Sequence, residues 1–220
     1  PYTWSAAEAM WHTPDVRDLS MYELNLAEFA RDVSGAIGRL EYLSDLGINC
    51  IQLMPVSNVA NEVDWGYLPI GYFGVDERFG NRRDLQQFID SAHQHGIAVL
   101  VDSVYGHTSR ASFAYSYLYT QLGYNENPFM GPFAQDLFSE QGASTDYNRT
   151  LTQDYFYSVN HHWLDDFHVD GFRYDCVPNF WDGPTGNGYA NLCYPTYQLT
   201  LSTLQSADPG YWKRFQSTQN

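Results

Sequence analysis

The chain has 220 residues, enough for one ordinary domain, and an apolar content of 44% that can build a folded core. Its formal net charge of −15 argues against nucleic acid and anionic membrane surfaces as partners, and no apolar run is long enough to cross a membrane. The three cysteines, Cys50, Cys176 and Cys193, form no disulfide framework, which favours a soluble protein of the cytoplasm.

The spacing of apolar residues predicts strands that alternate with helices. In chain order we expect a strand over 18–24, a helix over 36–46, a strand over 49–54, a helix over 84–95, a strand over 98–101, a helix over 152–167 and a strand over 169–174. The four apolar residues of the third strand indicate burial on both faces. This alternation predicts parallel βαβ units.

Two of the expected strands end in polar side chains. Asp102 closes the strand over 98–101, and His107 follows five residues later in the next loop. Arg173 lies two residues before Asp175, so their side chains point to the same side of an extended strand, and the guanidinium favours the ionised carboxylate. Such a carboxylate suits a nucleophile, although a structural ion pair is the alternative for an isolated R-x-D. Parallel sheets build active sites at the carboxyl ends of their strands.

These segments resemble signatures of the alpha-amylase superfamily, glycoside hydrolase family 13. Residues 102–107 read DSVYGH and match its D-x-V-x-N-H signature except at Gly106. Residues 171–175 read GFRYD and match its G-F-R-x-D signature without a gap. Residues 51–56 resemble the second barrel strand, and residues 64–67, DWGY, resemble the substrate loop after it.

The resemblance runs from about residue 21 to 182 and implies an α/β fold, a TIM (β/α)8 barrel with only about the first four βα units in this chain. We then expect residues 1–107 to be the first part of the barrel, 108–150 a B-domain-like insertion and 151–220 the barrel continuation. The aromatic-rich insertion would wall one side of a sugar cleft, and a floppy surface insertion is the alternative. Because half a barrel leaves open sheet edges, we expect the rest of the barrel in a longer polypeptide or a separate chain.

The resemblance also implies the roles of a retaining glycosidase, in which one carboxylate forms a glycosyl-enzyme and a second acts as acid and base. The implied assignments are Asp175 as nucleophile, Arg173 holding it, Asp102 supporting the site, His107 bonding a sugar hydroxyl, Tyr67 stacking beneath that sugar and Trp65 shaping the same wall. The alternatives are a strand-end cap for Asp102, a loop histidine for His107 and core packing for Tyr67. The family's acid/base Glu lies on strand five and is expected outside this chain, so the chain alone should be inactive; Glu126 and Glu140 do not fit its position.

The expected partners are an α-glucan or malto-oligosaccharide substrate and the C-terminal half of the same protein. Hydrolysis or transfer, and α-1,4 or α-1,6 bonds, stay open, although several segments look closer to the branching-enzyme, isoamylase and trehalohydrolase side of the superfamily. A non-catalytic glucan-binding or protein-interaction module is the alternative function.

We expect no cofactor or metal. Gly106 lacks the side-chain oxygen with which Asn binds calcium in calcium-bearing members of the family, so calcium is doubtful. His93 and His95, two apart on a helix, face apart, and the adjacent His161 and His162 do not share a face either, so neither pair suits a metal.

Overall fold

A computed structural model of the chain describes residues 1–60, 65–109, 113, 127–129, 142–177, 185–188 and 190–205. Its elements in chain order are the 3₁₀ turns η1 (Glu8–Met10) and η2 (Val16–Asp18), then β1 (Met21–Leu24), α1 (Leu26–Ala30), α2 (Val33–Ile37), α3 (Leu40–Asp45), β2 (Cys50–Leu53), α4 (Arg82–Gln94), β3 (Ala98–Ser103), β4 (His107–Ser109), β5 (Gly142–Ser144), α6 (Thr150–Phe167), β6 (Gly171–Tyr174) and α7 (Ala190–Gln205).

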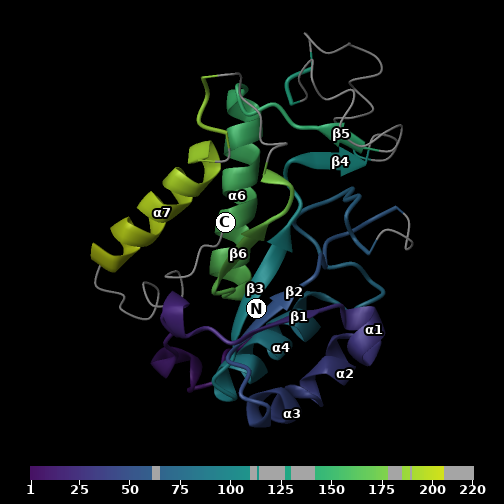
Figure 1. The fold of residues 1–220 in the computed structure, drawn as a ribbon, viewed down its shortest axis with the longest axis vertical. Helices are drawn as coiled ribbons and strands as arrows, with labels where there is room; N and C mark the ends of the chain where they lie inside the picture. Colours follow the sequence, from purple (N-terminus) through teal and green to yellow (C-terminus); the bar gives the residue numbers. More distant parts are fainter. Residues whose placement is uncertain are drawn as a thin grey trace.

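Four strands form one parallel sheet in the order β1-β2-β3-β6, which confirms the predicted βαβ units. Helix α4 connects β2 to β3, and α6 connects the β4–β5 pair to β6. In Figure 1 the antiparallel pair β4–β5 lies beyond the carboxyl end of β3, and α7 lies beside α6. Because all four strands are parallel, their carboxyl ends lie at the same edge of the sheet.

Each face of the sheet carries its own apolar cluster because successive strand residues point to opposite sides. The helix-covered face holds the larger cluster, in which the strand residues Ile51, Val99 and Phe172 share a core with Phe88 of α4 and Phe156 of α6. The other face holds a small cluster of Trp11, Cys50, Ala98 and Leu100. All six residues of β3 are buried, as the apolar run over 98–101 predicts.

A buried group of ionisable side chains fastens the N-terminal segment to the amino ends of β3 and β6. We call Glu8, Trp11, His93 and Asp170 the basal cluster. His93 Nδ1 lies 2.6 Å from Glu8 Oε2, and His93 Nε2 lies 2.9 Å from Asp170 Oδ2. Trp11 stacks on the imidazole at 4.4 Å and donates from Nε1 to Asp170 Oδ1 at 2.7 Å. The Val99 amide donates to Asp170 Oδ2 at 2.7 Å, so the cluster joins both strands and the segment before them.

Charge pairing in the basal cluster outweighs the cost of burial. Burial alone would lower the pKa of His93, but Asp170 and Glu8 raise it to about 9. Burial alone would raise the pKa of Glu8, but hydrogen bonds from His168 and His93 lower it to about 2. Asp170 also donates its backbone N–H to the Val99 carbonyl oxygen at 2.8 Å.

Two of the predicted elements differ most from the structure. The single helix expected over 36–46 is two short helices, α2 and α3, because the chain turns at Gly38, the C-cap of α2, before α3 begins at Leu40. The strand expected over 18–24 begins only at Met21, since the Asp15 side chain accepts from the Arg17 amide and starts a 3₁₀ turn instead.

Several expectations fall outside the described residues. Most of the insertion expected over 108–150 does, as do Asp64, Glu126 and Glu140. Within the ranges that the structure describes, no helix combines the length and apolar character needed to span a bilayer.

Replacing His93 with glutamine in the full-length protein should lower the free energy of unfolding by about 3 kcal/mol near pH 6, because two buried carboxylates lose their cation. The raised pKa of His93 means that its contribution is complete below pH 6.5 and is lost as the pH rises through about 9. The lowered pKa of Glu8 means that its contribution is complete above pH 4.5 and is lost as the pH falls through about 2. Urea denaturation at pH 6 and pH 9.5 measures the difference between wild type and variant.

His95→Gln is the matched control, because His95 is exposed on the same helix end. An unfolding penalty for His93→Gln that is the same at both pH values would contradict the charged state assigned to His93.

Candidate active site

The carboxyl ends of β3 and β6 bring three predicted site residues together. The register of the two strands sets Asp102 directly opposite Arg173. Asp175 follows the last residue of β6, and its backbone N–H donates to the Ser103 carbonyl oxygen at 3.1 Å, which continues the ladder by one bond. Asp102, Arg173 and Asp175 therefore point to the same face of the sheet, with the Arg173 guanidinium between the two carboxylates.

A single nitrogen of Arg173 bridges both carboxylates. Arg173 Nη1 donates to Asp102 Oδ1 at 2.9 Å and Oδ2 at 3.0 Å, and to Asp175 Oδ1 at 2.6 Å. The Asp102 side chain is 0% exposed, whereas the side chain of Asp175 keeps 17% exposure and that of Arg173 34%. Of the two acids, Asp175 is the one that a ligand can reach.

The loop after β2 and strand β4 add two more predicted residues to this group. The Tyr67 hydroxyl donates to Asp102 Oδ2 at 3.0 Å. His107, the first residue of β4, donates from Nε2 to the Tyr67 carbonyl oxygen at 2.6 Å, and its own carbonyl oxygen accepts from the Tyr72 hydroxyl at 3.1 Å. Asp175, Arg173, Asp102, Tyr67 and His107 thus form one continuous chain of polar contacts, which we call the site chain.

Burial and charge set the protonation preferences in the site chain. Burial raises the pKa of Asp102 to about 6, although Arg173 and Tyr67 act to lower it. Burial lowers the pKa of Arg173, but hydrogen bonds and charges from Asp102 and Asp175 together raise it above its ordinary value. Burial first and the Asp102 charge second raise the pKa of Tyr67. The guanidinium therefore stays charged, and Tyr67 stays a donor, over the ordinary pH range.

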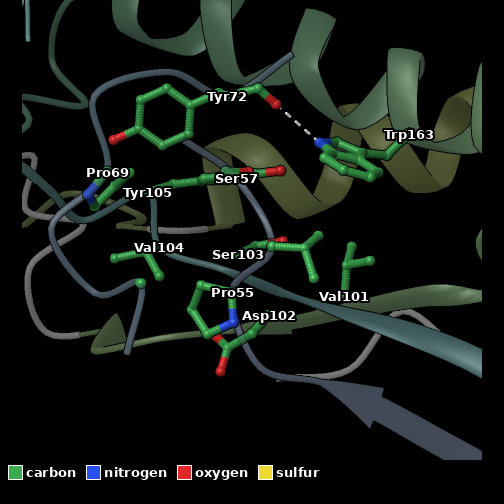
Figure 2. A pocket seen from close by; sticks show the side chains of 12 residues that line it. Pro55, Ser57, Pro69, Tyr72, Val101, Asp102, Ser103, Val104, Tyr105 and Trp163 are labelled. Atoms are coloured by element: carbon green, nitrogen blue, oxygen red, sulfur yellow. Dashed lines mark hydrogen bonds between the residues drawn. The ribbon is translucent and has the colours of Figure 1, made fainter. Parts of the chain in front are cut away.

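A narrow cavity lies behind the site chain. It has a volume of about 10 Å³, room for about one water molecule and too little for a sugar ring. Figure 2 shows Asp102 at one end of this cavity and Tyr72 at the other, where the Tyr72 carbonyl oxygen accepts from Trp163 Nε1 at 3.0 Å. Apart from these residues the lining is mainly apolar and includes Pro55, Val56, Pro69, Val101 and Val104. A ligand larger than a water molecule would have to bind on the open side, where Asp175 is accessible.

Trp65 is the sixth predicted site residue, and among the described residues its side chain is bonded to Glu28 and not to the site chain. It is 59% exposed and donates from Nε1 to Glu28 Oε1 of α1 at 3.1 Å. Trp65 lies two residues before Tyr67 in the same loop, so the backbone links it to the site chain.

The described residues do not fit a metal ion. Among them, no group of three or more His, Cys, Asp or Glu side chains could hold one. Gly106 offers no side-chain oxygen where the resemblance implies a calcium ligand. His161 and His162 instead pair along the helix with Asp165 and Asp166 at 2.7 and 2.6 Å.

Two contacts of the site chain were missed from the sequence. The sequence pairs the Arg173 guanidinium only with Asp175, and it predicts for Tyr67 a stacking role or, as the alternative, core packing. The Arg173–Asp102 contact depends on the register of two strands that are 71 residues apart in the chain, and no local pattern encodes that register. The Tyr67–Asp102 bond depends on the path of the loop after β2. The DWGY motif indicates that this loop belongs to the site, but it does not indicate which residue Tyr67 contacts.

Several known proteins are similar to this chain in sequence. Residues 24–130 match the family model described as "Alpha amylase, catalytic domain". The chain is 37% identical over 191 residues to the 1,4-alpha-glucan branching enzyme GlgB of Shewanella frigidimarina, covering 79% of this chain and 24% of that protein. It is 28% identical over 162 residues to the malto-oligosyltrehalose trehalohydrolase of Saccharolobus solfataricus, covering 73% of this chain and 28% of that protein.

A solved structure shares the fold. The debranching enzyme of Nostoc punctiforme superposes with a TM-score of 0.70 at 21% identity, over 86% of this chain and 49% of that chain. The four-stranded parallel sheet is therefore part of an alpha-amylase-type TIM barrel, as expected. The chain spans about a quarter of the length of the curated relatives it matches.

The Asp102 carboxyl should titrate near pH 6 in the full-length protein. ¹³C NMR of carboxyl-labelled aspartate measures this titration, and the Asp102→Asn variant identifies the Asp102 signal. Tyr67→Phe removes only a hydroxyl that donates to the ionised acid, so the midpoint should move to higher pH. A midpoint near or below 4 in the wild type, or no shift in Tyr67→Phe, would contradict the buried geometry described for Asp102.

Proposed function

The chain belongs to the alpha-amylase superfamily, glycoside hydrolase family 13, and from this premise we propose that it carries the nucleophile of a retaining enzyme acting on α-glucosidic bonds. The proposed substrates are starch, glycogen or malto-oligosaccharides. Relatives named 1,4-alpha-glucan branching enzyme, at 37% and 32% identity, favour transfer of the glucan to another glucan over transfer to water.

One observation carries the proposal: the Arg173 guanidinium contacts an accessible carboxylate and a fully buried one at the same time. Asp175 Oδ1 accepts from Arg173 Nη1 at 2.6 Å. Asp102, at 0% side-chain exposure, anchors the guanidinium from the other side. An oriented and reachable carboxylate beside a cation, at the carboxyl end of a barrel strand, is what a glycosidase nucleophile requires.

The proposed reaction has two steps. An Asp175 oxygen attacks the anomeric carbon of the glucosyl unit, the bond from that carbon to the leaving oxygen breaks, and an acid donates a proton to the leaving oxygen. An acceptor hydroxyl of a second glucan, or water, then attacks the same carbon, gives its proton to the now basic acid/base group and releases Asp175. Retention of configuration follows from two inversions.

The other members of the site chain act on this step in different ways. Arg173 holds and orients Asp175. Asp102 is a positioning residue, because its buried side chain acts on the substrate through Arg173 and Tyr67. The Tyr67 ring would pack against the CH face of the reacting sugar. His107, held by the Tyr67 carbonyl oxygen through Nε2, would offer its ring to a sugar hydroxyl.

The acid/base is proposed to come from the remaining barrel. In the family a Glu on strand five has this role, and the parallel sheet described here contains the four strands that precede it. Retaining enzymes place the two carboxyl groups about 5–5.5 Å apart, so that Glu must come within this distance of Asp175. The insertion over 108–150 is proposed as the wall of the cleft next to His107.

Trapping with 2-deoxy-2-fluoro or 5-fluoro glucosyl fluoride should label the full-length protein at Asp175, identified by mass spectrometry of the modified peptide. Asp175→Asn should lose both the label and at least about 10⁴-fold in kcat, because the nucleophile is gone. Asp45→Asn, a carboxylate change on the exposed end of α3, is the control and should label normally.

Labelling at another residue, with activity retained in Asp175→Asn, would refute the nucleophile. Glucan binding without turnover or label would instead favour the non-catalytic glucan-binding module.

A further inference from the structure

Tyr174 lies between Arg173 and Asp175 in the chain but points to the opposite face of the sheet. Successive residues of a strand alternate between faces, so Tyr174 shares the helix-covered face with Phe172. Its ring is 3% exposed and packs on the rings of Phe172 and Tyr105, with centroids 5.8 and 6.0 Å away. The strand therefore buries a phenol hydroxyl directly behind the two residues that face the site.

The Tyr174 hydroxyl joins β6 to both neighbouring helices. Asn160 of α6 donates from Nδ2 to the Tyr174 hydroxyl at 2.9 Å and to Thr196 Oγ1 of α7 at 3.0 Å. The Tyr174 hydroxyl is also hydrogen-bonded to the side chain of Cys193 on α7. Helices α6 and α7 lie side by side (Figure 1), so one amide and one hydroxyl tie three elements together. We call Asn160, Tyr174, Cys193 and Thr196 the helix-side junction.

The polar character of the junction needs an explanation, because apolar side chains of similar size could fill the same space. Asn160 and Thr196 are both 0% exposed. Among the described residues Asn160 Oδ1 accepts no hydrogen bond, so its burial carries a desolvation penalty. Burial raises the pKa of Tyr174 well above its ordinary value, so the hydroxyl keeps its proton. The two N–H donors of Asn160 are thus kept at a cost in stability, which favours a role beyond packing.

The junction meets β6 where the strand ends. Tyr174 is the last residue of β6, and the next ladder bond runs from the Asp175 N–H to the Ser103 carbonyl oxygen at 3.1 Å. Cys176 then turns the chain with φ 48°, in the left-handed region. On the site face Arg173 Nη1 donates to Asp175 Oδ1 at 2.6 Å, and on the helix face the Tyr174 hydroxyl is held. The end of the strand is therefore fixed from both faces.

We propose that the helix-side junction is a positioning device for the nucleophile: by holding Tyr174, it keeps the Asp175 carboxylate at hydrogen-bond distance from Arg173. The proposal rests on the proposed function, since it takes Asp175 as the nucleophile. The junction residues are positioning residues that do not touch the substrate and act through the backbone of β6. Docking of α7 against α6 thereby becomes a condition for the active geometry at the strand end.

Kinetics of Tyr174→Phe in the full-length protein, with an α-glucan as substrate, test the junction. The variant keeps the ring and loses the hydroxyl, so kcat should fall at least about tenfold with KM nearly unchanged, as expected for a displaced reacting group. The titration midpoint of Asp102, followed by ¹³C NMR, should move to higher pH. The reason is that Arg173 acts to lower the pKa of Asp102, and its contact loosens in the variant.

Thr196→Val and Thr196→Ser keep the test decisive if Tyr174→Phe fails to fold. Valine removes the acceptor of the Asn160 amide and should lower kcat severalfold, whereas serine keeps the hydroxyl and should leave kcat at the wild-type value. Tyr2→Phe is the matched control, because it removes a hydroxyl that binds α4 instead, donating to Asp90 Oδ2 at 3.0 Å. Both kcat and the Asp102 midpoint should stay unchanged in this control.

A lower free energy of unfolding in Tyr174→Phe and Thr196→Val, with kcat and the Asp102 midpoint unchanged, would overturn the proposal, because the junction would then be structural only. An equal loss of kcat in Tyr2→Phe would contradict it as well. Failure of the proposed function has a different signature: Asp175 takes no label and Asp175→Asn stays active, while the Asp102 midpoint still moves in Tyr174→Phe.

Discussion

The Arg173 guanidinium, shared by Asp102 and Asp175, is the interaction on which the rest of the site depends. One Nη1 atom holds a buried carboxylate and an accessible one at 2.9 and 2.6 Å. Within the described residues Arg173 is the cation paired with the buried acid, so it offsets part of the desolvation of Asp102, and Tyr67 adds one hydrogen bond. Removing the guanidinium would leave two acids facing each other across the strand ends.

This arrangement requires that β3 and β6 keep one register, and the strands are fastened at both ends. At their amino ends Asp170 bonds both the N–H and the carbonyl oxygen of Val99, and His93 and Trp11 hold its carboxylate. At their carboxyl ends Arg173 crosses between the strands. A slip of β6 by one residue would turn Arg173 toward the helices and break its contacts with Asp102.

Much of this could be predicted from the sequence, and the exceptions have physical causes. The alternation of strands and helices, the buried third strand and the pairing of Arg173 with Asp175 follow from local periodicity, and the structure confirms them. The Arg173–Asp102 contact and the basal cluster join residues far apart in the chain, so no local spacing reveals them. The break at Gly38 was missed because apolar residues continue at helical spacing through it. The ion pairs of His93 could not be predicted, because its two acidic partners are 77 and 85 residues away.

A crystal structure of the full-length protein with a bound malto-oligosaccharide measures the central contact directly. The account predicts Arg173 Nη1 within hydrogen-bond distance of both Asp102 and Asp175, with the other face of Asp175 turned to the anomeric carbon of a bound glucose. An Arg173 side chain that leaves either acid, or an Asp175 carboxylate sealed away from the sugar, would contradict it.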